Sequence, residues 1–109
     1  MIFSGTLYYE DSSDILKFDR LIIREDSISF QATTTWDAWG KWTVDSRAVK
    51  SGLGYETIDA IAHQLPNRSN SCKLAFTGIE TDEDGANVTG FWEENGSEYK
   101  FSGYLDRIR

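Results

Sequence analysis

Side chains that could act as nucleophiles or metal ligands are scarce in this sequence. His63 is the only histidine and Cys72 the only cysteine, and no Ser, His and Asp residues can be grouped into a catalytic triad. A zinc site needs several Cys or His ligands, which the chain does not supply. The segment 82–87 begins like a calcium loop but lacks a third acidic ligand and the distant bidentate Glu. We therefore expect no enzymatic activity, no bound metal and no cofactor.

Aromatic side chains are the more informative group. The chain of 109 residues contains four tryptophans, and three of them stand close to predicted turns. Tyr9, Trp36 and Trp92 come shortly before a turn, and Trp39 lies within one. An indole ring offers a flat apolar wall with one N–H donor, which suits an aromatic or apolar ligand. These four residues predict a small-molecule site, and a well-filled core is the alternative interpretation.

Acidic side chains suggest a second function. The net charge of −7 argues against nucleic acid and against an anionic membrane as partners. Five carboxylates fall in two turns that a meander would place at the same end: Glu25, Asp26, Asp82, Glu83 and Asp84. They would suit a basic protein partner, as in an inhibitor or immunity-type protein. Solubility alone also explains the charge.

The elements that carry these residues are predicted to be strands. Apolar and polar residues alternate over several segments, most regularly over 28–36. Residues 55–64 fit either a strand beginning at Tyr55 or a helix with an apolar stripe, and the neighbouring strands favour the strand. The expected strands are 2–9, 15–24, 28–36, 40–49, 55–64, 72–81 and two in 88–105.

The strongest local signal is a β-hairpin over 88–105. Asn95-Gly96 supplies the two positive φ angles of a type I′ turn. This turn places Trp92 opposite Tyr99 and Gly90 opposite Phe101. We expect a fixed register here, with an apolar and aromatic inner face.

A second turn predicts how the preceding strand pairs with this hairpin. Glu83-Asp84-Gly85 fits a three-residue turn with Gly85 in the left-handed conformation. That turn would place Phe76 opposite Trp92. An apolar–hydroxyl–glycine triplet recurs at 3–5, 76–78, 88–90 and 101–103, and inward glycines help a sheet to coil and close. The chain is therefore predicted to be one all-β domain over 1–109, an antiparallel up-and-down meander of seven or eight strands that closes as a barrel.

The first hairpin resembles that of a known family. Phe3-Ser4-Gly5-Thr6-Leu7-Tyr8-Tyr9-Glu10-Asp11-Ser12-Ser13 resembles the opening of the avidin and streptavidin family, calycin-type small β-barrels. That family begins with a hydrophobic residue and Thr-Gly-Thr-Trp-Tyr-Asn, followed by a short turn that ends in Ser. The resemblance implies an eight-stranded up-and-down barrel with a ligand in one mouth, and it places Ser13 at a position that hydrogen-bonds biotin.

Two positions depart from this family. Leu7 stands where the family has tryptophan, and Tyr9 stands where it has the asparagine that binds the ureido ring of biotin. Tyrosine is too bulky for that role, so we expect negligible biotin binding. The expected ligand site thus consists of Tyr9, Ser13, Trp36, Trp39 and Trp92.

The sequence also suggests a location. The first residues have no basic region followed by a long apolar stretch, as a signal peptide would. The longest aliphatic run, Leu21-Ile22-Ile23, is far too short to span a bilayer. We expect a cytoplasmic protein.

Overall fold

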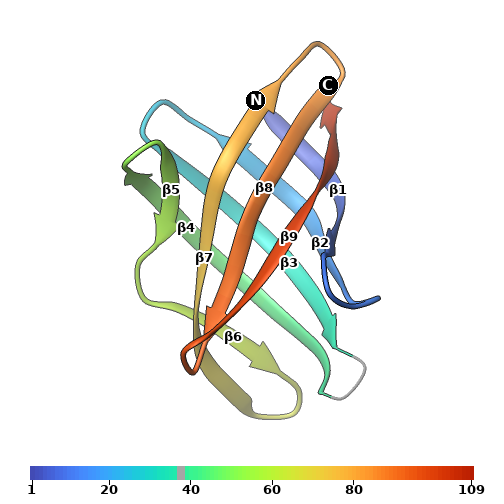
Figure 1. Ribbon diagram of the computed structural model, residues 1–109, viewed down its shortest axis with the longest axis vertical. Coiled ribbons are helices and arrows are strands. Elements are labelled where there is room, and N and C mark those ends of the chain that lie inside the picture. The colour runs from blue at the N-terminus through green and yellow to red at the C-terminus, as the bar shows by residue number, and fades with distance from the viewer. Residues whose placement is uncertain (37–38) are drawn as a thin grey trace.

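The computed structural model describes residues 1–36 and 39–109, and their regular structure consists of β-strands (Figure 1). No helix long and apolar enough to cross a membrane occurs among them. The predicted all-β class is confirmed. The strands are β1 Ile2–Tyr9, β2 Ile15–Ile23, β3 Ser27–Trp36, β4 Gly40–Ser51, β5 Gly54–Thr57, β6 Ala60–Gln64, β7 Arg68–Thr81, β8 Gly85–Glu94 and β9 Ser97–Ile108.

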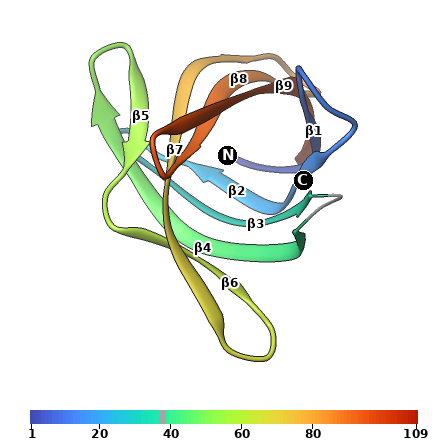
Figure 2. The same ribbon diagram turned by 60° about the horizontal axis from the view of Figure 1, so that its bottom comes forward.

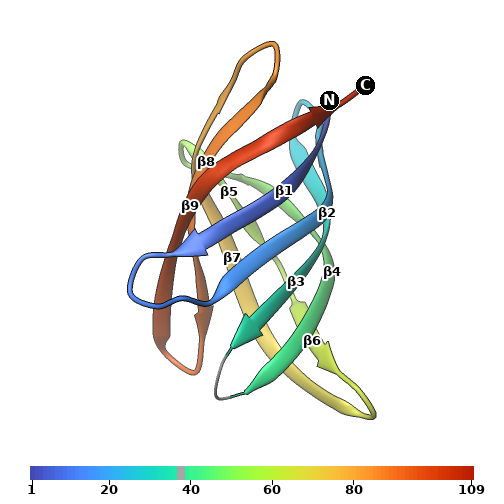
Figure 3. The ribbon, with the colours of Figure 1, turned by 90° about the vertical axis from the view of Figure 1, so that its right-hand side faces the viewer.

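The strands close into a barrel, as predicted. Neighbouring strands pair antiparallel in chain order, except that β5 and β6 pair with β4 and β7 and not with each other. The first strand also pairs with the last: Ile2 lies opposite Ile108, and Tyr9 lies opposite Phe101. Figure 3 shows β1 between β9 and β2. Seen from the lower end, the ribbons surround one interior (Figure 2). Closure leaves no exposed edge at the seam between the chain ends.

The segment 55–64 is extended, so the helical alternative for it is wrong. It forms two short strands that both lie between β4 and β7, with β5 near one end of the barrel and β6 near the other. Ile58 and Asp59 interrupt them, and Asp59 has a φ of 57°, a conformation that Asp tolerates better than most residues. Nine strands therefore fill eight positions around the barrel.

The hairpin of β8 and β9 has the predicted register. Asn95 and Gly96 have φ values of 51° and 80°, as a type I′ turn requires. Trp92 pairs with Tyr99, and Gly90 pairs with Phe101. The local turn signal was therefore sufficient to fix this pair of strands.

The predicted turn between β7 and β8 is wrong. Gly85 does not have a positive φ. Instead, Asp82 Oδ1 accepts hydrogen bonds from the backbone N–H groups of Asp84 at 2.7 Å and Gly85 at 2.9 Å. The carboxylate thus holds a tighter turn and removes the need for a left-handed glycine.

The predicted pairing of Phe76 with Trp92 is also wrong, because of the tighter turn and because of a β-bulge on β7. Thr77 is an extra residue on β7, a β-bulge, between the pairs Phe76–Gly90 and Gly78–Thr89. The tighter turn and the bulge shift the strand in the same direction. Leu74 consequently takes the position opposite Trp92.

The barrel interior is filled by aromatic rings. Phe18, Phe30, Phe76 and Phe101 are buried, and their neighbouring ring centroids lie 5.6 to 6.1 Å apart. The tilted and edge-to-face orientations are those that aromatic pairs prefer. The centre of the barrel is therefore a packed core, and a ligand would have to bind above it.

The turns of the meander lie at the two ends of the barrel. The lower end in Figure 1 carries the β6–β7 and β8–β9 turns, the end of β3 and the start of β4. Of the loop predicted at 37–39, residues 37 and 38 lie outside the described residues. The opposite end carries both chain termini and the β2–β3, β4–β5 and β7–β8 turns. The aromatic residues described next lie on the strands where these approach the lower end of the barrel.

Candidate functional site

Four predicted aromatic residues meet at the lower end, together with Tyr99. The ring centroids of Tyr9 and Trp36 lie 4.5 Å apart. The Trp36 centroid also lies 6.1 Å from that of Trp92 and 5.3 Å from that of Tyr99. Trp36 is thus the common neighbour of three rings. We call Tyr9, Trp36, Trp39, Trp92 and Tyr99 the aromatic mouth.

Two adjoining clefts open at the aromatic mouth. The first has a volume of about 350 Å³ and the second about 320 Å³, sizes at the lower end of small-molecule sites. Trp36, Trp39, Glu94 and Tyr99 line both clefts. The first cleft is also lined by Tyr9, Asp11, Ser12, Asp14 and Lys100, and the second by Trp42, Ala62, Arg68, Asn70, Trp92, Asn95 and Ser97.

The rings of the mouth divide into a buried floor and exposed walls. Tyr9 and Trp92 have exposed fractions of 5% and 1%, whereas those of Trp39 and Tyr99 are 70% and 42%. Covering such exposed apolar walls with a ligand would remove them from water and favour binding. The floor connects to the core, since Tyr9 packs edge-to-face against Phe101.

The backbone at Trp39 is held in place although its ring is exposed. The carbonyl oxygen of Trp39 accepts hydrogen bonds from Trp42 Nε1 at 3.1 Å and from Gln64 Nε2 at 2.7 Å. A Cβ atom at Gly40, which has a φ of 79°, would lie 2.9 Å from that Gln64 nitrogen. Glycine at position 40 thus lets β6 support the wall of the clefts.

The hydroxyl of Tyr9 is held by a hydrogen bond at the floor of the aromatic mouth. It lies 2.9 Å from Thr34 Oγ1, which itself donates to the Ile15 carbonyl at 3.1 Å, so Tyr9 must be the donor to Thr34. Burial raises the pKa of Tyr9 far above its usual value; the bond to Thr34 lowers it only in part, and the charges of Glu94 and Asp14 raise it further. Tyr9 therefore stays neutral at physiological pH.

Glu94 is the carboxylate that both clefts share. Its Oε2 accepts a 2.6 Å hydrogen bond from Asn70 Nδ2, which fixes the group at the end of β8. After burial, which is the largest cause, its charge also raises the pKa of Tyr9 on β1 and of Cys72 on β7. Because Glu94 lines both clefts, its negative charge borders both.

Cys72 is predicted to be an unreactive thiol. Burial, with a smaller contribution from Glu94, raises the pKa of Cys72 to about 12, so the thiolate is about one part in ten thousand at pH 8. We expect alkylation by iodoacetamide at pH 8 to be at least about a hundredfold slower than for a free cysteine. The rate can be followed by mass spectrometry.

The variant Glu94→Gln should increase this alkylation rate, since one cause of the raised pKa is removed. Glu93→Gln serves as the control, because consecutive residues of a strand point to opposite faces. Alkylation of the native wild-type thiol at the rate of free cysteine would contradict this assignment.

One polar atom at the floor lacks a partner. The indole N–H of Trp92 is buried and has no acceptor among the described residues. A buried donor without an acceptor costs free energy. Because Trp92 lines the second cleft, an acceptor on a bound molecule could reduce this cost.

Ser13 differs from the other four predicted ligand-binding residues. It is exposed in the loop between β1 and β2. Among the described residues that line the first cleft are its neighbours Ser12 and Asp14, but not Ser13 itself. The structure therefore places Ser13 beside the first cleft.

Three of the cleft residues that the predicted site lacked could have been found from strand alternation. Tyr99 was expected opposite Trp92, which already placed it near the mouth. Glu94 continues the inward alternation of β8 beyond Trp92. Trp42 lies two residues before the buried Val44 on β4, so alternation places both on the same face. Strand alternation carried to the strand ends would have found all three.

The five acidic residues of the predicted rim do not form one cluster. Glu25 and Asp26 lie in the β2–β3 turn, and Asp82, Glu83 and Asp84 lie in the β7–β8 turn. Between these turns stand β3, β4, the shared β5/β6 position and β7 in one direction, and β2, β1, β9 and β8 in the other. The turns are therefore at the same end but on opposite sides of the barrel.

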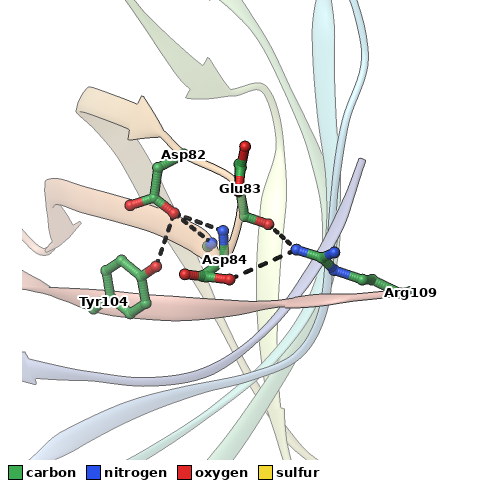
Figure 4. A network of polar contacts seen from close by, with 6 residues as sticks. Asp82, Glu83, Asp84, Tyr104 and Arg109 are labelled. Atoms are coloured by element: carbon green, nitrogen blue, oxygen red, sulfur yellow. Dashed lines mark hydrogen bonds and ion pairs between the residues drawn. The ribbon is translucent and has the colours of Figure 1, made fainter.

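The β7–β8 turn is also bound to the last strand (Figure 4). Asp82 Oδ1 accepts a hydrogen bond from the Tyr104 hydroxyl at 3.0 Å. The Arg109 guanidinium lies 3.7 Å from Asp84 Oδ1 and donates to the Glu83 carbonyl. Part of the acidic charge is thus offset within the chain.

The hydrogen bonds to Asp82 predict a measurable titration. The backbone N–H groups of Asp84 and Gly85, and then the Tyr104 hydroxyl, hold the pKa of Asp82 below its usual value. A lowered folded pKa stabilises the fold at pH values above the unfolded pKa, and this stabilisation is lost as the pH falls through the folded pKa. Tyr104→Phe should raise the pKa of Asp82 towards its usual value, as measured by NMR titration of the carboxyl carbon. An unchanged titration would show that Tyr104 does not bind the ionised carboxylate.

Possible metal ligands are dispersed: among the described residues, no three His, Cys, Asp or Glu side chains are grouped so that they could hold a metal ion. Comparison with known proteins adds no family to this description, since no protein-family model matches the chain and no curated protein matches it.

Proposed function

We propose that the protein is a non-catalytic binding protein that takes an aromatic or apolar small molecule at the aromatic mouth. The observation that carries the proposal is the pair of adjoining clefts, about 350 and 320 Å³, with exposed aromatic walls above a packed barrel. A flat ring placed against Trp39 and Tyr99 would bury apolar surface that is otherwise in water. The filled core restricts the ligand to the mouth.

Intrinsic tryptophan fluorescence is a suitable measurement for this proposal. All four tryptophans of the chain line the clefts, so any change in their emission reports on the mouth. Titration with a panel of small aromatic compounds should change the emission of the wild-type protein in a saturable manner. The absence of saturable binding across the panel at millimolar concentration would refute the proposal.

A pair of variants locates the binding. Trp36→Leu removes the common neighbour of three rings and should weaken binding. Phe91→Leu should leave binding unchanged, because Phe91 is adjacent to Trp92 on β8 and therefore points to the outer face. Calorimetry is the appropriate measurement here, because Trp36→Leu changes the fluorescence itself. Equal weakening by both variants would show that binding is not at the mouth.

Biotin is expected to bind negligibly. The Tyr9 ring packs against Trp36, and its hydroxyl is bonded to Thr34, so position 9 offers neither space nor a free polar group for a ureido ring. Tight biotin binding would contradict this argument about Tyr9.

A further inference from the structure

We propose that the first cleft selects an organic cation, with a methylated ammonium group as the recognised chemistry. This inference rests on the proposed function and specifies its ligand. It follows from the combination of aromatic rings and carboxylates in one cleft.

The first cleft combines four aromatic side chains with three carboxylates. Tyr9, Trp36, Trp39 and Tyr99 supply the rings, and Asp11, Asp14 and Glu94 supply the negative charge. Lys100 is the basic side chain that lines this cleft among the described residues. The second cleft, in contrast, balances Glu94 with Arg68. The excess of negative charge is therefore specific to the first cleft.

The rings of this cleft meet at angles. The planes of Tyr9 and Trp36 differ by 34°, and those of Trp36 and Tyr99 differ by 54°. Rings inclined in this way can direct several faces towards one bound group. The face of an aromatic ring carries negative electrostatic potential and attracts a cation, with Trp as the strongest partner.

The carboxylate of Glu94 is positioned for this role. Asn70 holds it at 2.6 Å, and among the described residues no lysine or arginine side chain lies within ion-pair distance of it. Its influence on the pKa of Tyr9 shows that its charge reaches the floor of the first cleft. Glu94 can therefore attract a cation without first breaking an ion pair with a basic side chain.

A methylated ammonium group fits this environment better than other ligand groups. A neutral apolar group would cover the carboxylates without compensating their lost hydration. A primary ammonium ion would have to give up strong hydrogen bonds to water. A quaternary ammonium ion has no N–H donors and an apolar surface, so it can contact the rings and the carboxylates together. The net charge of −7 also favours the approach of a cation.

A pair of isosteric probes tests the inference. (3-Hydroxyphenyl)trimethylammonium and 3-tert-butylphenol have the same shape and differ in charge. We expect the ammonium compound to bind about tenfold more tightly in calorimetry at low salt, and the difference to decrease as salt is added. If both compounds bind equally, or the phenol binds more tightly, the charge selection is refuted while the proposed function stands. If neither binds at millimolar concentration, this inference and the proposed function both fail for these probes.

Two charge-matched variants identify the carboxylate. Glu94→Gln keeps the shape of the side chain and an acceptor for Asn70. It should weaken binding of the ammonium compound about threefold to tenfold and leave the affinity for the phenol unchanged. Glu80→Gln makes the same change in net charge on the exposed part of β7 near the opposite end, and it should leave both affinities unchanged. Equal weakening by both variants would assign the effect to net charge and overturn the role of Glu94.

Discussion

Gly90→Ala is expected to destabilise the protein by about 3 kcal/mol, at the upper end of the range for overpacked sites. A Cβ atom at position 90 would lie 2.0 Å from the backbone oxygen of Ala75 and 2.9 Å from the Phe101 ring. A ring can rotate away, but a backbone oxygen in a paired strand cannot move without disturbing the sheet. The contact with Ala75 therefore dominates the cost.

The same close approach occurs on the other side of β7. A Cβ atom at Gly54 would lie 2.1 Å from the Phe76 carbonyl oxygen, so glycines on β5 and β8 flank β7 at adjacent residues. The Thr77 bulge follows immediately. Together these features bend the sheet sharply at this level, and a side chain at position 90 would oppose that bend.

Gly96→Ala provides the control for Gly90→Ala. A Cβ atom at position 96 would meet nothing within 4 Å, although its φ of 80° is unfavourable for alanine, so we expect a loss of about 1 kcal/mol. Denaturant unfolding of the two variants measures the difference. A smaller loss for Gly90→Ala than for Gly96→Ala would show that the approach of β7 and β8 is not as close as described.

Phe76→Ala is expected to cost about 3 to 5 kcal/mol, as for other fully buried aromatic residues. The Phe76 ring contacts those of Phe18, Phe30 and Phe101, so it is the centre of the aromatic core. Removing the ring would leave a cavity bordered by these three rings, of which Phe18 and Phe30 pack against each other. Few side chains could move in to fill that space.

Phe91→Ala is the matched comparison on the outer surface of the barrel. Its ring is only partly buried and lies 5.8 Å from the Lys73 ammonium group, so we expect a loss of roughly 1 kcal/mol. Thermal or denaturant unfolding distinguishes the two variants. Similar losses for both would mean that Phe76 does not occupy the centre of the core.

The parts of the fold that the sequence predicted are those set by short-range chemistry. Asn95-Gly96 determined its own turn and the register of β8 and β9, and alternation placed Tyr9, Trp36 and Trp92 inward at one end. The Thr77 bulge lies on β7 between β5 and β8, and the break at Ile58–Asp59 lies between β4 and β7. Neither was predictable, because each depends on strands that pack on both sides of it. No local pattern carries that information.

The candidate site shows the same division. The aromatic members could be predicted because strand ends and turns identify a barrel mouth. The hydrogen bond that holds Glu94 was not predictable, because it depends on the length of β7, which begins at Arg68 and so brings Asn70 beside the end of β8. The expected strand began only at 72, whereas β7 begins at Arg68, because the polar residues 68–71 pair with β6.

The pairing of β1 with β9 also determines how the chain must fold. Contacts between residues 2–9 and 101–108 have nearly the greatest sequence separation that this chain allows, and such contacts form slowly because a large loop must close first. Each hairpin can form early, since its strands are neighbours along the chain. Until the two ends meet, β1 and β9 each retain an unpaired edge that another chain could join. Ring closure is therefore the step at which folding competes with aggregation, and we expect folding yield to depend on protein concentration.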